Sequence, residues 1–147
     1  MNPVYKKTAL AIFKRQLKQA LPHFKQIRAG LPQSTVFCRE HSKDLQVYVL
    51  VCWGSYEEKF NVRVGWTYRS TLDEMSSHFD PSTVLDFNAV IISLDALRGQ
   101  PEVWHNLRDT RHVILDAEGM ASVIASAIQE LMSIGVPMLE RVVSSKT

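Results

Sequence analysis

Two stretches of the chain, one near each end, carry apolar residues at helical spacing. In the first stretch these residues are Leu10, Phe13, Leu17 and Leu21. Their intervals of three and four residues place them on one face of a helix. Asn2 before Pro3 is typical of a helix start, and Pro22 disfavours continuation of the helix. The pattern predicts an amphipathic helix over residues 3–21.

The second stretch has a wider apolar stripe. It comprises Met120, Val123, Ile124, Ala127, Ile128 and Leu131. Asp116 can accept hydrogen bonds from the first backbone N–H groups of a helix, and Glu118 would suit the positive end of the helix dipole. Gly135 and Pro137 are typical of a helix end. The sequence therefore predicts a second long helix that begins after Asp116 and ends at Gly135.

Between these helices the apolar positions change to the period of a β-strand. Phe60, Val62, Val64 and Trp66 alternate with more polar residues, which predicts a strand with one buried face. The runs 36–39, 45–53 and 89–97 are rich in β-branched or aromatic residues and are predicted as further strands. A helix also fits the pattern of residues 89–97.

The remaining segments carry weaker patterns. Thr71 and Glu74 have the spacing of a capping box, which predicts a short helix over residues 72–78. The stretch that follows Pro22 is expected to be a loop, because Gly30 and Pro32 punctuate it.

Two further short segments precede the last predicted helix. Residues 102–107 are predicted as a single turn that carries Trp104. Residues 113–115 fit either a brief strand or an anchored loop.

Together these patterns predict one α+β domain spanning residues 1–147. We expect an antiparallel sheet of about four to five strands, packed by the long N-terminal and C-terminal amphipathic helices. The chain has 147 residues, of which 46% are hydrophobic, and a chain of this size can bury a core of its own.

The composition also bears on location and redox chemistry. No apolar run approaches the roughly 18 residues of a membrane span, and the N-terminus lacks the apolar stretch of a secretory signal. We therefore expect a cytoplasmic protein without membrane contact. Cys38 and Cys52 both fall in apolar β-like runs, which favours buried thiols over a zinc site or a disulfide.

Charge is distributed unevenly along the chain. No acidic residue precedes Glu40, whereas the first 39 residues hold eight lysines and arginines. The remainder has nine basic and fifteen acidic residues, a formal charge of −6. Such polarity can mark contact with nucleic acid or a membrane, but an ordinary basic helix covering an acidic body is the favoured explanation. No aromatic residues interleave with the basic positions of the first helix, so nucleic-acid binding is disfavoured.

The sequence offers no catalytic or cofactor motif that we can support. The six glycines are scattered, so no phosphate-binding loop is indicated. Ser55 follows Gly54, but no nucleophile elbow surrounds it, and a role in a turn explains it better. Glu74 and His78 share the spacing of metal ligands, but no second pair completes a site. We expect no catalytic residue, metal or cofactor.

The order of features resembles a family of small bacterial α+β proteins of unknown function, some of them encoded beside polymorphic toxin genes. The resemblance rests on residues 10–21, 60–65, 92–99 with Trp104, and 135–139. It implies an immunity protein, which binds a toxin made by the same cell and blocks it. That role needs a rigid scaffold and a complementary surface, with no catalytic group.

Acidic residues in turns and at element ends are the candidates for contact with such a partner, because toxins that attack nucleic acids tend to have basic sites. The candidates are Glu57, Glu58, Asp73, Glu74, Asp80 and Asp86. For any single one of them an ordinary solvated loop position is the favoured explanation. The alternative function is a small-molecule-binding or enzymatic domain with a pocket between sheet and helices, involving Trp53, Trp66 or Trp104.

Overall fold

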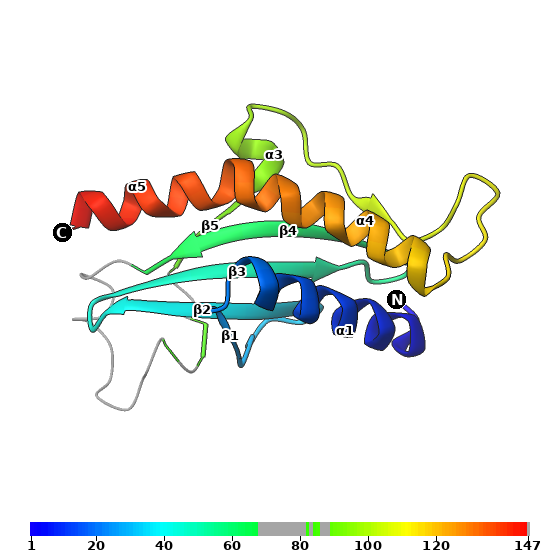
Figure 1. Cartoon of the computed structure of the whole chain (residues 1–147), viewed down its shortest axis with the longest axis horizontal. Coiled ribbons are helices and arrows are strands. Elements are labelled where there is room, and N and C mark those ends of the chain that lie inside the picture. Colours follow the sequence, from blue (N-terminus) through cyan, green and yellow to red (C-terminus); the bar gives the residue numbers. More distant parts are fainter. Residues whose placement is uncertain (68–81, 83, 86–88, 147) are drawn as a thin grey trace.

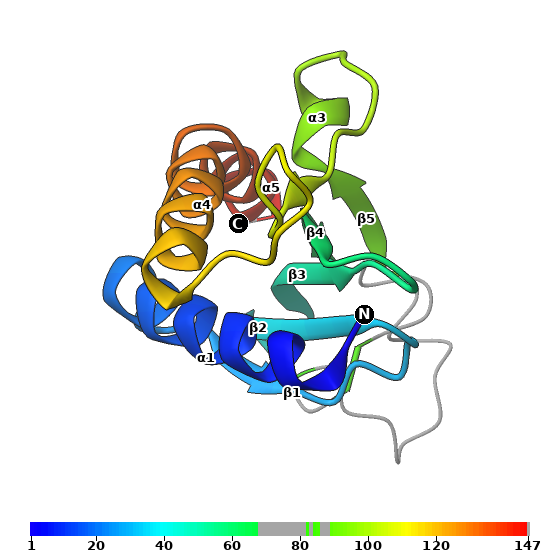
Figure 2. The same ribbon diagram turned by 90° about the vertical axis from the view of Figure 1, so that its right-hand side faces the viewer.

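Five strands form an antiparallel sheet, and the long helices lie across one of its faces (Figures 1 and 2). The computed structural model describes residues 1–67, 82, 84–85 and 89–146. Its elements are α1 (Pro3–Ala20), β1 (Lys25–Ile27), β2 (Ser34–Ser42), β3 (Leu45–Trp53), β4 (Lys59–Trp66), β5 (Val90–Ser93), α3 (Leu94–Leu97), β6 (His105–Asn106), α4 (Ala117–Glu130), η1 (Leu131–Gly135) and α5 (Val136–Lys146). The predicted α+β class is therefore confirmed.

The strands follow one another in the sheet in the order β1-β2-β3-β4-β5, and the two residues of β6 pair with the start of β4. In the central strand Val49 lies opposite Phe37 of β2 and Val64 of β4. These three side chains face the helices and belong to the main core. The register thus places the alternating apolar residues of β4 on the helix side, as their period predicts.

The main core lies between this face and α1, α4, η1 and α5. From α1 it takes Ala9, Ile12, Phe13 and Leu17. Phe13 stacks on Phe37 with ring centroids 5.9 Å apart and meets the ring of Phe60 edge-on. Burial of such side chains stabilises the fold by about 1.5 to 3 kcal/mol each before entropy is counted.

The opposite face of the sheet is apolar as well. Val36, Cys38, Tyr48 and Leu50 are buried there together with Leu85. The backbone N–H of Leu85 donates to the carbonyl of Arg28, 3.0 Å away, which ties the chain near Leu85 to the β1 edge. Both faces of β3 are consequently buried, so its run of apolar residues has no polar side.

Both predicted helix starts are confirmed. Asn2 Oδ1 accepts from the Val4 N–H at 2.9 Å, and Asp116 Oδ1 accepts from the Gly119 N–H at 2.7 Å. The predicted end of the second helix is wrong. The chain passes through the π-helical turn η1, where the Val136 N–H bonds to the Leu131 carbonyl, and continues as α5. Pro137 comes just after η1, so the N–H that proline lacks falls where the hydrogen bonds have already changed to the wider π-helical register.

Three segments between the long helices differ from their predictions. Residues 89–97 divide into β5 and the short helix α3, because Ser93 Oγ accepts from the Ala96 N–H and caps α3. Residues 102–107 contain β6 and no helical turn. Strand β1 lies within the predicted loop, and its three residues are held by pairing with β2 rather than by their own pattern. The helix predicted over residues 72–78 lies outside the described residues.

The continuous helix over residues 117–145 is long and apolar enough to cross a membrane by length and composition alone. In the structure its apolar stripe packs on the sheet, with Ile124, Leu131 and Leu139 almost fully buried. A single such helix is weak evidence for a membrane span.

Candidate functional site

The turn between β3 and β4, residues 54–58, is held from two sides. At the start of α1 the Met1 ammonium donates to the carbonyls of Gly54 and Ser55, at 3.0 and 2.6 Å. On the other side the Leu107 N–H donates to the Glu58 carbonyl at 2.8 Å. Arg108 Nε donates to Glu58 Oε2 at 2.9 Å. The turn is therefore fixed against both α1 and the segment before α4.

The ion pair between Glu58 and Arg108 is partly enclosed, because Glu58 is only 8% exposed. The hydrogen bond from Arg108 lowers the pKa of the Glu58 carboxyl, against the burial that would raise it. Arg108 also donates to the carbonyl of His112 at 2.7 Å. The Glu58 carboxylate, through Arg108, therefore holds the loop after β6 in place.

Beside the turn lies a surface hollow of about 440 Å³. Its lining includes Trp53, Tyr56, Glu57, Lys59 and Trp104. Lys59 Nζ lies 5.3 Å from the centroid of the Trp104 ring and 3.1 Å from Glu57 Oε2. The hollow therefore combines aromatic surface with a charge pair at its rim, and Tyr56 stands 96% exposed at the tip of the turn.

Large exposed hydrophobic side chains gather around this end of the molecule, onto which Figure 2 looks. Among the described residues the exposed large hydrophobics are Val4, Leu31, Tyr56, Val103, Val113 and Met132. Met132 lies on η1, away from the turn. We call the other five the turn-end surface.

Hydrogen bonds place each member of the turn-end surface near the β3–β4 turn. Val4 is in the first turn of α1, which Met1 ties to residues 54 and 55. Leu31 lies two residues before Gln33, whose carbonyl accepts from the Trp53 N–H at 2.7 Å. The Val103 carbonyl accepts from Asn61 Nδ2 at 3.2 Å. The Val113 carbonyl accepts from the N–H of Asp109, next to Arg108.

A second charge cluster joins α3 to α4. Arg98 pairs with Asp95 at 2.6 Å and with Glu130. Asp95 also accepts from the Val103 N–H at 2.8 Å. Burial acts to raise the pKa of the Asp95 carboxyl, but the hydrogen bonds from Val103 and Arg98 outweigh it and the pKa is lowered.

His105 belongs to the same cluster. Its ring stacks on Phe60 with centroids 5.0 Å apart, and Nε2 lies 3.7 Å from Glu130 Oε2. Burial lowers the pKa of His105, although the charges of Glu130 and Asp95 act in the opposite direction. No described nucleophile lies against this imidazole. The cluster therefore serves to hold the segment from α3 to β6 in place.

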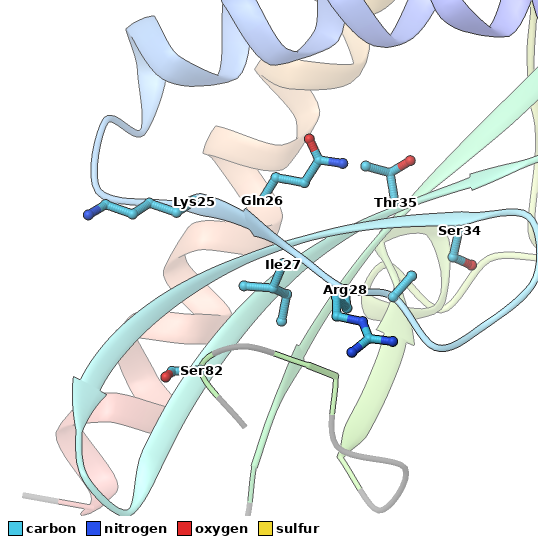
Figure 3. A pocket seen from close by; sticks show the side chains of 8 residues that line it. Lys25, Gln26, Ile27, Arg28, Ser34, Thr35 and Ser82 are labelled. Carbon is cyan, nitrogen blue, oxygen red and sulfur yellow. The ribbon is translucent and has the colours of Figure 1, made fainter. Parts of the chain in front are cut away.

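Two shallow hollows flank strand β1 at the edge of the sheet. The larger, about 700 Å³, is lined by Lys25, Gln26, Ile27, Arg28, Ala29, Ser34, Thr35 and Ser82. The other, about 550 Å³, is lined by Pro22, His23, Lys25, Cys38, Arg39, Glu40 and Ser82. In Figure 3 the side chains of Gln26 and Thr35 point to one side of β1, whereas Ile27 and Arg28 point to the other. These groups do not converge on one centre, as a catalytic site would require.

The structure places the two described contact candidates differently. The side chain of Glu57 is 70% exposed, at the rim of the turn-end hollow. Glu58, in contrast, is buried in its pair with Arg108. The other candidates, Asp73, Glu74, Asp80 and Asp86, lie outside the described residues, as does His78.

The other residues weighed from the sequence have structural surroundings. Ser55 is exposed in the β3–β4 turn. Cys52 is partly buried and accepts from Ser34 Oγ at 3.8 Å. Trp53 and Trp66 are buried in the main core, and the three hollows described above lie at the surface rather than between sheet and helices. Within the described residues no three His, Cys, Asp or Glu side chains come together as a metal site.

Patterns in the sequence did not single out Tyr56, Val4, Leu31, Val103 or Val113. An aromatic residue inside the polar turn 54–58 was a usable signal, because turns seldom bury such a side chain. Val103 and Val113 gave no comparable signal, since isolated valines in loops are common. No protein-family model, curated protein or solved structure matches this chain.

Proposed function

We propose that this protein is a protein-binding module that engages its partner through the turn-end surface. The observation that carries the proposal is that five large hydrophobic side chains exposed in the described chain lie on the β3–β4 turn or on segments hydrogen-bonded near it. Isolated exposed apolar residues are normal, but a concentration of them at one end of a molecule marks an interaction site.

The turn-end surface is preorganised for binding. Its central turn is fixed by the Met1 hydrogen bonds and by the pair between Glu58 and Arg108. A surface that is already ordered loses little conformational entropy when a partner binds. The partly enclosed ion pair is therefore a support for the surface, while the exposed side chains make the contacts.

Tyr56 and Trp104 are the expected anchors of the interface. Tyrosine and tryptophan dominate binding energy in protein interfaces because they bury a large area with few rotatable bonds. Tyr56 projects from the turn, and Trp104 lines the hollow beside it. Glu57 at the rim would supply the charge that orients the partner.

The specific form of this function that we propose is an immunity protein that binds and neutralises a toxin. The support is the sequence resemblance together with a surface suited to protein contact. In this form the partner is encoded beside the gene for this protein.

Co-expression with the product of the neighbouring gene tests the proposal. The tagged protein should retain that product on an affinity column, and Tyr56→Ser should reduce the affinity about tenfold or more, as for an interface hot spot. Met132→Ser is the matched control, because it removes an exposed apolar side chain elsewhere on the surface. Retention that is equal for the two variants, or no retention by the unaltered protein, would refute the proposal.

A further inference from the structure

The sheet has two edges, formed by β1 and β5, which lie at its opposite borders (Figure 2). An edge strand presents backbone N–H and C=O groups that have no partner within the sheet, and a strand of another molecule can pair with them. Folded proteins usually prevent such pairing by placing charged residues, proline or a bulge on the edge, or by covering it. The two edges of this sheet differ in these protections.

The β1 edge is both charged and covered. Lys25 and Arg28 are exposed there, and in a pair of β1 strands their like charges would repel. Val84 forms a parallel bridge with Arg28, and the Leu85 N–H donates to the Arg28 carbonyl at 3.0 Å. This edge is therefore protected against the addition of a strand.

The β5 edge carries none of these protections. Its sequence, Val90–Ser93, contains no charged residue and no proline. Its register with β4 runs without a bulge from Ser93 opposite Arg63 to Val90 opposite Trp66. Among the residues that the structure describes, no strand or bridge pairs with the outer side of β5. Within the described chain this edge is open.

The side chains of β5 extend both apolar layers of the sheet to its edge. Val90 and Ile92 pack against the main core on the helix side, whereas Ala89 and Ile91 pack against the layer on the opposite side. All four are only half-buried, so each layer ends in apolar side chains. A strand that continues both layers must itself be apolar on both faces. Antiparallel strands commonly have one polar face, so this requirement excludes most of them.

Strand β5 of a second molecule meets this requirement. It is apolar on both faces, it has the same length, and it presents the same open edge. An interface between two identical molecules must also be self-complementary, and a strand without charges places no like charges opposite each other. We propose that two copies of this chain associate by antiparallel pairing of their β5 strands, which joins the two sheets into one.

The symmetry of such a dimer fixes its register. A two-fold axis normal to the sheet reverses the strand direction and keeps the helices of both copies on the same side. Residues directly opposite each other then share a face of the sheet, so Ile91 lies opposite the second copy's Ile91, and Val90 opposite its Ile92. The turn-end surfaces lie beyond the start of β4, at opposite ends of the joined sheet, and stay free. The proposal therefore does not depend on the proposed function.

The first test is the mass of the unaltered protein in solution as a function of its concentration. Four residues at about 3.4 Å each give a paired segment of only about 14 Å. We therefore expect a weak dimer, with a dissociation constant between about 10 μM and 1 mM. Sedimentation equilibrium should show the mass rising from monomer towards dimer over this range. A monomer throughout would overturn the proposal and leave the edge to a strand of a different protein.

Two variants at the symmetric position test the register. Ile91→Lys and Ile91→Glu should each weaken self-association at least tenfold, because two like charges then face each other across the axis. An equimolar mixture of the two variants should form a heterodimer, because opposite charges then face each other. Circular dichroism checks that each variant folds. If neither does, the concentration dependence of the unaltered protein still decides the proposal.

Met132→Lys is the matched control, because it adds the same charge at an exposed apolar side chain on η1, away from β5. It should leave the dissociation constant within about threefold of its original value, through net charge alone. A dimer that persists in Ile91→Lys, or an equal loss in Ile91→Lys and Met132→Lys, would show that β5 is not the interface. Folded Ile91→Lys and Ile91→Glu proteins that stay monomeric when mixed would contradict the self-paired register.

Discussion

Single residues in this protein owe their properties to partners distant in the sequence. Glu58 and Arg108 are separated by 50 positions, and Arg63 and Glu102 by 39. Each pair fixes a loop of the second half of the chain to strand β4 or its preceding turn. The pKa of Glu58 is lowered as a consequence, so this pair contributes stability at neutral pH that is lost as the pH falls through the lowered pKa.

His105 yields a prediction about pH. Burial lowers its pKa in the folded protein, whereas the unfolded chain takes up the proton near pH 6.5. Stability is therefore lost as the pH falls below about 6.5, where the unfolded state binds more protons than the folded state. His105→Gln should show a smaller loss of unfolding free energy between pH 7.5 and pH 5.5 than the unaltered protein, measured by guanidinium denaturation at both values.

A second replacement separates the proton from the shape of the ring. His105→Phe keeps an aromatic ring that can stack on Phe60 but cannot be protonated. It should show the same reduced pH dependence as His105→Gln, whatever its absolute stability. A loss with pH equal to that of the unaltered protein in both variants would contradict the prediction.

At the scale of elements, two glycines permit close approach between neighbours. In β4 a Cβ on Gly65 would lie 2.6 Å from the Val90 carbonyl oxygen. In η1 a Cβ on Gly135 would lie 2.9 Å from the side chains of both Leu131 and Leu94. The first glycine lets β5 pair with β4, and the second lets the long helix lie against the sheet.

Gly65→Ala should destabilise the protein by about 2 to 3 kcal/mol, because a backbone atom must move to make room. The change should be seen as a lower midpoint of denaturant unfolding. Ser122→Ala, an exposed change on α4, should alter the stability by about 0.5 kcal/mol or less. A Gly65→Ala protein as stable as this control would show that β5 can shift without cost.

Gly135→Ala tests the packing of η1. Alanine favours a helix over glycine by about 1 kcal/mol, so a site without crowding would gain stability. We expect a net loss of about 1 to 2 kcal/mol, since the added methyl group meets side chains on two elements. Ser133→Ala in the same turn is the control, and a stabilised Gly135→Ala protein would contradict the packing described.

At the scale of the whole molecule, the sheet joins two apolar layers. Its helix side holds the main core, and its opposite side buries Tyr48 and Leu50. Because β3 contributes to both layers, neither layer can separate without exposing the other. The fold should therefore behave as one cooperative unit.

This cooperativity can be measured with the tryptophans. Trp53 and Trp66 are buried in the main core, so their fluorescence reports on packing, while far-ultraviolet circular dichroism reports on the helices. The two signals should give coincident denaturant transitions. A helix signal that persists after the fluorescence transition would show that α1, α4 or α5 forms without the sheet.

The sequence by itself determined the features that depend on local periodicity and capping. The helix starts at Asn2 and Asp116 and the strand around Val62 and Val64 follow from side chains that act on neighbouring backbone. The α+β class followed from these elements, because each has an apolar face that must be covered. Local chemistry is sufficient for such features.

Tertiary structure alone decided the features that depend on distant contacts. Strand β1 exists because β2 pairs with it, and the helix passes Pro137 because η1 changes the hydrogen-bond register. The turn-end surface is assembled from five separate segments of the chain. Contacts between residues far apart in the sequence depend on how the chain folds in three dimensions. The spacing of residues along the chain therefore does not predict them.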